Sequence, residues 1–148
     1  MGSYAALMAA FSALAAGFAT WFRRSGRQLP ETMGTRDLML LSVAGHKIAR
    51  LIAKDRVASP VRAPFTRYVG DAGPGEVSEE ARGRGPRRAV GELLVCPYCL
   101  SMWTSAGLTA LLLVVPRFTR WFASVFATFF GAELLQMAYK KAEETIGD

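Results

Sequence analysis

The chain has 148 residues, of which 51% are hydrophobic and 20% charged, and its formal net charge is +6. This length allows one domain at most, and two cysteines exclude the disulfide framework of a small secreted protein. The mean hydropathy of +0.20 is high for a soluble domain, and the apolar residues are gathered in uncharged blocks. We therefore predict an all-α integral membrane protein with three or four transmembrane or membrane-associated helices, with a soluble helical bundle as the alternative.

Four helices are predicted, at about residues 4–22, 37–53, 97–115 and 120–139. The first is uncharged and is followed by Arg23 and Arg24. A signal peptide carries its positive charge before the apolar segment, so we expect this helix to be retained in the membrane. The second helix is apolar in its first half and amphipathic in its second half. It either crosses the membrane or lies in the interface.

A long polar loop, at about residues 54–92, separates the second and third helices. Its Gly, Pro and charge content predicts a flexible segment over residues 71–88. If all four helices span the membrane, ten basic residues lie on the side of this loop and the C-terminus, and six lie on the other side. This excess predicts that the loop and the C-terminus are cytoplasmic. We expect a multi-pass protein of the cell membrane whose basic residues meet anionic lipids rather than nucleic acid.

Polar residues from three helices are expected at similar depth in the cytoplasmic leaflet. Lys47 and Arg50 come from the second helix, Cys96 and Cys99 from the third, and Glu133 from the fourth. Ionisable groups inside a membrane are costly, so they usually pair or serve a function. We expect Glu133 to form an ion pair with Arg50 or Lys47 as a structural clamp. The alternatives are a role in moving protons, ions or a ligand, and a Glu133 side chain that faces water.

The sequence CPYC opens the third helix, because Pro97 suits the first helical position and Cys96 the cap position. Cys96, Cys99 and Trp103 then share one face, with Trp103 at the membrane interface or in a pocket wall. Three interpretations of the dithiol stay open: a redox pair that exchanges electrons with a quinone, half of a zinc site, or a reduced pair used for packing and capping. His46 is the only other soft ligand, so a closed zinc site requires two chains.

Together these residues resemble the pattern of a family of small bacterial membrane proteins, domain-of-unknown-function family 1360. That pattern has a helix ending in Arg-x-x-Arg-Leu, an aspartate, a later arginine, and Leu-Leu-x-Cys-x-x-Cys-x-x-x-Trp opening a long helix. The similarity covers about residues 38–138, and the matching positions are Lys47, Arg50, Leu51, Asp55, Arg62, Leu93, Leu94, Cys96, Cys99 and Trp103. Lys47 stands where the pattern has arginine. The resemblance implies a small multi-spanning membrane protein, adds Asp55 and Arg62 to the polar cluster, and implies no activity.

The sequence contains no recognisable nucleophile–base set and no nucleotide-binding loop. We therefore expect an inner-membrane protein with a structural, assembly or accessory role rather than an enzyme. No cofactor is expected, and the expected partner is a second copy or another membrane protein. The alternatives are a thiol-disulfide or quinone-linked oxidoreductase that uses Cys96 and Cys99, and a zinc site that these cysteines share across a dimer. The expected polar cluster comprises Lys47, Arg50, Asp55, Arg62 and Glu133.

Overall fold

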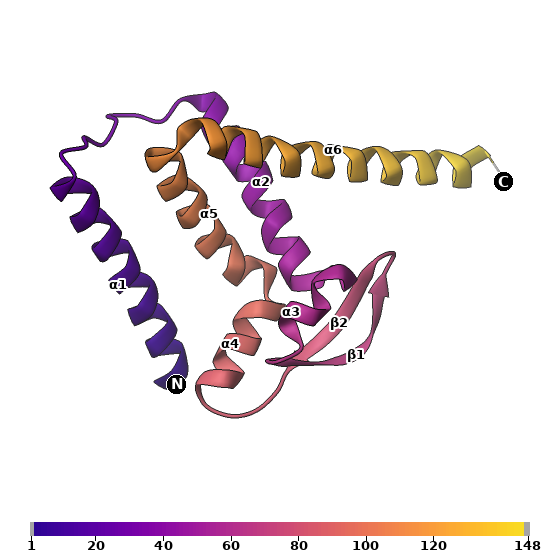
Figure 1. Ribbon diagram of the computed structural model, residues 1–148. Coiled ribbons are helices and arrows are strands. Elements are labelled where there is room, and N and C mark those ends of the chain that lie inside the picture. The colour runs from indigo at the N-terminus through magenta and orange to yellow at the C-terminus, as the bar shows by residue number, and fades with distance from the viewer. Residues whose placement is uncertain (1, 147–148) are drawn as a thin grey trace.

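The chain folds into four long helices and a smaller unit that contains a β-hairpin (Figure 1). The computed structural model describes residues 2–146. The long helices are α1 (Gly2–Arg24), α2 (Thr35–Lys54), α5 (Pro97–Val114) and α6 (Pro116–Ile146). Between α2 and α5 lie the 3-10 turn η1 (Arg56–Ala58), α3 (Ser59–Arg62), β1 (Thr66–Gly73), β2 (Glu76–Ala81) and α4 (Pro86–Val95). We call residues 55–95 the cap.

The four predicted helices are present and the chain is mostly helical as predicted, but it is not all-α, because residues 66–81 form a β-hairpin. The predicted loop at 54–92 is the cap, in which two short helical segments, a hairpin and α4 follow one another. The predicted helix ends also differ, most of all for α6. This helix begins at Pro116, where proline suits the first helical turn, and continues through the polar residues up to Ile146.

The hairpin replaces the flexible segment predicted from composition. β1 and β2 pair antiparallel, with Thr66 opposite Ala81 at the open end and Gly73 opposite Glu76 at the turn. Gly73 and Gly75 have φ values of +146° and +77°, which glycine adopts readily and other residues rarely adopt. Most of the outward positions are charged or small, so the strands have the composition of a loop. The glycines of the turn are the sequence signal that distinguishes a β-hairpin from a flexible loop.

The core lies where α2 packs against α5 and α6. One cluster of buried apolar residues joins all three helices and contains Leu41, Ala44, Leu108, Leu112 and Ala123. A second cluster joins α2 to the start of α5 through Ala49, Ala53 and Leu100. The alanines on α2 let the helix backbones approach closely, because a methyl group is the whole side chain. α2 is therefore the central helix, and its polar second half lies beside the other helices and the cap.

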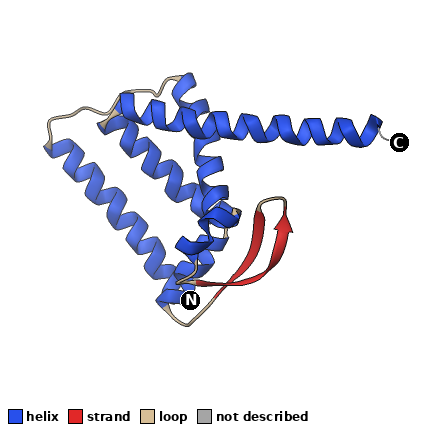
Figure 2. Cartoon of the chain, turned by 45° about the vertical axis from the view of Figure 1, so that its right-hand side comes forward, coloured by secondary structure: helices blue, strands red, loops and turns tan. Residues whose placement is uncertain are grey.

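Three helices are long and apolar enough to cross a membrane: Tyr4–Arg24, Pro97–Val114 and Pro116–Ile146. α2 is not one of them, since charged residues occur in both its halves. Both views show α1 lying beside α5 and α4, and the C-terminal part of α6 projecting away from the other elements (Figures 1 and 2). From residue 134 to residue 146 every side chain of α6 is exposed.

A close approach between α4 and the base of the hairpin requires glycine at position 91. A methyl group there would overlap the carbonyl oxygen of Phe65 and would lie 2.9 Å from Cβ of Ala81. The obstacle includes backbone, so a side-chain rotation cannot relieve it. We expect Gly91→Ala to lower the free energy of unfolding in detergent micelles by about 2–3 kcal/mol.

Gly131→Ala is the matched control for this prediction, because a methyl group at Gly131 meets no atom within 4 Å. Both positions are helical, so replacing glycine by alanine raises the intrinsic helix stability by a similar amount in both variants, up to about 1 kcal/mol. The control variant should be as stable as the unmodified protein or more stable. Equal changes in the two variants would contradict the close packing of α4.

Candidate functional site

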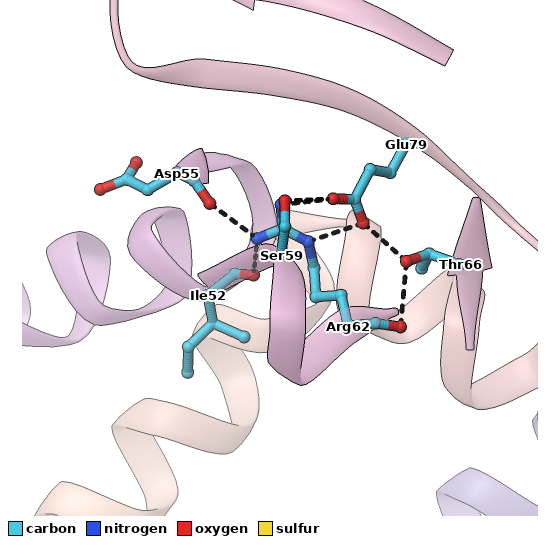
Figure 3. A network of polar contacts seen from close by, with 6 residues as sticks. All are labelled: Ile52, Asp55, Ser59, Arg62, Thr66 and Glu79. Atoms are coloured by element: carbon cyan, nitrogen blue, oxygen red, sulfur yellow. Dashed lines mark hydrogen bonds and ion pairs between the residues drawn. The ribbon is translucent and has the colours of Figure 1, made fainter. Parts of the chain in front are cut away.

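Arg62 and Glu79 form a buried ion pair at the centre of the cap (Figure 3). Nε and Nη2 of Arg62 donate to the two carboxylate oxygens of Glu79, each at 2.9 Å. The side chains of Arg62 and Glu79 are 0% and 5% exposed. Ser59 and Thr66 also donate to Glu79, each at 2.6 Å, so both carboxylate oxygens have two donors. A guanidinium fork on a carboxylate is a strong and directional contact.

Arg62 also joins the cap to the end of α2. Its Nη1 donates to the carbonyl oxygen of Ile52 at 2.6 Å and to that of Asp55 at 3.1 Å. The last carbonyl groups of a helix have no partner within the helix, and a positive side chain near them is favourable. One arginine therefore connects the end of α2, the short helix α3 and strand β2, as Figure 3 shows.

The same contacts set the pKa of Glu79. Burial raises the pKa of this carboxyl group, but hydrogen bonds from Arg62, Ser59 and Thr66 and the charge of Arg62 outweigh it and lower the pKa from 4.5 to about 2. Between pH 4.5 and pH 2 the unfolded chain therefore binds more protons at Glu79 than the folded chain does. The stabilisation from this group is complete above pH 4.5 and is lost as the pH falls to about 2.

We expect the free energy of unfolding to fall by about 3 kcal/mol between pH 5 and pH 2 through Glu79 alone. Denaturant-induced unfolding at several pH values measures this change. Glu79→Gln should be less stable at pH 7, and its stability should depend less on pH in this window because the amide does not titrate. If both proteins show the same pH dependence, the carboxylate of Glu79 is not held as the structure shows.

A second buried network surrounds Lys47. Its ammonium group lies 2.5 Å from Oε1 of Glu133 and 3.4 Å from Oδ2 of Asp55, and the side chain of Lys47 is 1% exposed. The same ammonium lies over the ring of Phe129, 4.3 Å from the ring centre. Glu133 and Phe129 stand four residues apart on α6, and Asp55 directly follows α2. The network thus joins α2, α6 and the first residue of the cap.

Arg50 does not join that network, although it was one of the two predicted partners of Glu133. Its Nη2 lies 2.6 Å from Oε1 of Glu76 at the start of β2. The expected polar cluster is therefore divided. Lys47, Asp55 and Glu133 contact one another, and Arg50 is paired with Glu76 of the hairpin. Arg62 pairs with Glu79 instead, and its contact with this cluster is the hydrogen bond to the backbone carbonyl of Asp55.

Cys96 and Cys99 are paired as a disulfide at the N-terminus of α5. Cys96 occupies the N-cap position of helix α5, as predicted, and its sulfur accepts a hydrogen bond from the backbone N–H of Cys99 at 3.2 Å. Cys99 and Tyr98 are exposed. In the part of the chain that the structure describes, no group of three or more His, Cys, Asp or Glu side chains could hold a metal ion.

Trp103 lies one turn deeper in α5 and contacts α1. Its ring packs edge-on against Phe11, with 5.1 Å between the ring centres. His46 is exposed and packs edge-on against Phe130, far in sequence from the cysteines, with ring centres 5.6 Å apart. Trp103 lines the groove between α1 and α5, which is one of its two predicted positions, and a position at the membrane interface stays a prediction.

A sequence model of the family described as protein of unknown function (DUF1360) matches residues 40–139. The chain belongs to this family. A curated relative, sporulation protein YjcA of Bacillus subtilis (strain 168), is 33% identical over 87 residues, which is 57% of this chain and 74% of the relative. No solved structure matches the chain significantly.

The segment shared with the DUF1360 family contains every predicted site residue. It begins within α2, includes the whole cap and α5, and ends within α6. Both buried networks and the cysteine pair therefore belong to the family domain, whereas α1 lies outside it.

One ion pair of this DUF1360 member has no clear signal in the sequence. Arg120 donates from Nε and Nη2 to the two carboxylate oxygens of Asp37, each at 2.8 Å, and so joins the start of α6 to the start of α2. Each residue alone looks like an ordinary charge at a helix end. Only the packing of α2 against α6 shows that they meet, at the opposite end of α2 from Lys47.

Proposed function

We propose that this DUF1360 protein is an accessory protein of the bacterial cell membrane with a structural role and no catalytic activity. α1, α5 and the first part of α6 cross the bilayer, and α2 crosses beside them with its charges covered by neighbouring helices. The cap lies at the cytoplasmic surface, in agreement with the excess of basic residues there. Its role is to present the cap as a rigid unit at a fixed distance from the membrane.

The use of the buried polar groups supports this proposal most directly. Within residues 2–146, every buried side-chain nitrogen or oxygen has a hydrogen-bond partner. The buried charges of Arg62 and Lys47 are directed at internal carboxylates, and these contacts join the cap to α2 and α6. A catalytic or transport site would instead aim some of these groups into a cavity.

The relative's name gives a cellular process. YjcA of Bacillus subtilis is called a sporulation protein. By extension, we propose that this chain acts by binding another membrane protein or a second copy of itself during a process of the cell envelope. The exposed final part of α6 and the outer edge of the hairpin provide surface for such contacts.

Membrane extraction combined with cysteine labelling tests the proposal. In a Cys96→Ser/Cys99→Ser background, Ala72→Cys places a single thiol in the exposed hairpin. We expect the protein to stay in the membrane pellet after alkaline carbonate washing. The thiol should react with a membrane-impermeant maleimide only after the cells are opened. A protein released by carbonate, or a thiol labelled on intact cells, would contradict the proposed placement.

A thiol–disulfide function is the second candidate, and the cysteine pair at the α5 N-terminus, with Cys99 exposed and Cys96 half-buried, favours it. A helix N-terminus stabilises a thiolate, so we expect the thiol of reduced Cys96 to be alkylated faster than that of free cysteine. The alkylation rate of the reduced protein, compared with that of free cysteine, measures this effect. Turnover of a quinone or a disulfide substrate that disappears in Cys96→Ser would replace the structural proposal by this one.

A further inference from the structure

Three arginines of the cap lie in one short loop and have no carboxylate partner. Each of the six acidic residues of the cap forms an ion pair with another basic residue. Among the described residues, the arginines of the cap that remain outside such pairs are Arg82, Arg84 and Arg87. All three are exposed and lie between the end of β2 and the first turn of α4. The unpaired positive charge of the cap is therefore concentrated in residues 82–87, which we call the arginine loop.

The arginine loop holds two of these guanidinium groups close together. Nε of Arg82 and both Nε and Nη2 of Arg87 donate to the carbonyl oxygen of Pro64, at 3.4, 2.9 and 2.6 Å. Two positive groups therefore share one neutral acceptor and lie within roughly 6 Å of each other, a distance at which like charges repel. The turn between them depends on Gly83, whose φ is +87° and against which the side chain of Arg87 packs. An anion beside the two guanidinium groups would relieve their repulsion.

Arg84 lies between these two arginines in the sequence and has a free guanidinium group. Within residues 2–146 its side chain takes part in no hydrogen bond and no ion pair, whereas its neighbours Arg82, Arg87 and Arg88 all do. Replacing Arg84 by a neutral residue therefore removes a charge from the loop without removing an internal contact. This property separates binding of a ligand from a purely structural role of the loop.

The arginine loop lies where α1 and α5 begin. α4 follows the loop, contacts α1 and ends two residues before the start of α5. Both views show the loop and α4 beside the N-terminal end of α1 (Figures 1 and 2). α1 and α5 are two of the three helices long and apolar enough to cross a membrane, so the loop belongs to the end at which both would leave the bilayer. Anionic headgroups at a cytoplasmic membrane surface attract arginine side chains.

We propose that the arginine loop binds the phosphate group of an anionic phospholipid at the cytoplasmic membrane surface. Guanidinium groups bind phosphate through paired hydrogen bonds, and the negative charge offsets the repulsion between Arg82 and Arg87. The bound lipid holds the cap against the membrane. The loop has no aromatic side chain on which a base could stack, which favours a lipid over single-stranded RNA. This inference rests on the membrane placement proposed above and adds the contact that fixes the cap there.

Native mass spectrometry of the full chain in mild detergent tests the proposal after incubation with equal amounts of phosphatidylglycerol and phosphatidylcholine. We expect phosphatidylglycerol to be retained in preference, and Arg84→Gln to reduce this preference by about fivefold. Arg117→Gln is the matched control, because Arg117 is also exposed and outside the ion pairs of residues 2–146 but lies beyond the other end of α5. This control should change the preference by less than about twofold. Hydrogen exchange of residues 82–90 should slow with phosphatidylglycerol and not with phosphatidylcholine.

Two results would overturn the proposal: equal retention of both lipids, or equal losses in Arg84→Gln and Arg117→Gln. If an equimolar amount of inorganic phosphate removes the lipid, a free phosphate and not a lipid is the ligand. If a short uridine RNA does so in an Arg84-dependent way, the loop is a nucleic-acid site. Failure of the membrane placement has a separate signature, namely release by carbonate or labelling of Ala72→Cys on intact cells.

Discussion

Arg62→Met is expected to lower the free energy of unfolding by about 3–5 kcal/mol, the largest effect of any substitution considered. The methionine has a similar length, but it leaves the carboxylate of Glu79 buried beside two hydroxyl donors without its positive partner. The carbonyl oxygens of Ile52 and Asp55 also lose a donor. Denaturant-induced unfolding in detergent micelles measures the change, and hydrogen exchange of β2 should report it locally.

Arg67→Met is the matched control in the same hairpin. Arg67 pairs with Glu80 across the strands, but the two side chains are 69% and 57% exposed. Exposed ion pairs contribute little, so the expected loss is at most about 0.5 kcal/mol. Arg62→Lys separates charge from geometry, since it keeps the charge but cannot form the fork. If Arg62→Met were no more harmful than Arg67→Met, the cap would not depend on the buried pair.

Lys47→Met is expected to cost about 2 kcal/mol, less than Arg62→Met because its partners can reach water. The side chains of Glu133 and Asp55 are 33% and 16% exposed, so their charges are partly solvated when Lys47 is lost. The cation–π contact with Phe129 is lost as well. Unfolding in micelles gives the magnitude, and faster proteolysis between α2 and α5 should show that the cap has loosened.

Arg50→Met on the same helix is the control for Lys47→Met. Arg50 is 46% exposed and its partner Glu76 is 21% exposed, so its loss should cost less than about 1 kcal/mol. The pair of variants also distinguishes the two partners that the sequence allows for Glu133. A larger effect at Arg50 than at Lys47 would contradict the network that the structure shows.

The long helices are predictable from sequence because an uncharged run of about 20 residues, such as residues 4–22, is typical of a membrane-spanning helix. The pairing of Lys47 with Glu133 is partly predictable for a similar reason. Both residues interrupt apolar helices at similar depth, and a buried charge requires a partner. Depth along a helix does not specify direction around its axis, so Arg50 is an equally good candidate until the packing of α2 is known.

The cap is not predictable in the same way, because its strands have the composition of a loop. Glu79 looks like one of several surface acids, and only the register of β2 against β1 turns it towards Arg62. Arg50 meets Glu76 for the same reason, since the turn places the start of β2 near the end of α2. The family pattern includes Arg62 and Asp55 but gives no geometry for them.

A double-mutant cycle between Lys47 and Glu133 tests the central claim most directly, namely that the buried charges hold the elements of the fold together, here α2 to α6, and have no catalytic role. The free energies of unfolding of Lys47→Met, Glu133→Leu and the double variant are compared with that of the unmodified protein. We expect a coupling of about 1.5 kcal/mol or more, because each charge is costly without the other. A coupling within about 0.3 kcal/mol of zero would contradict the claim, and Glu133 would then be free to serve a ligand or a proton.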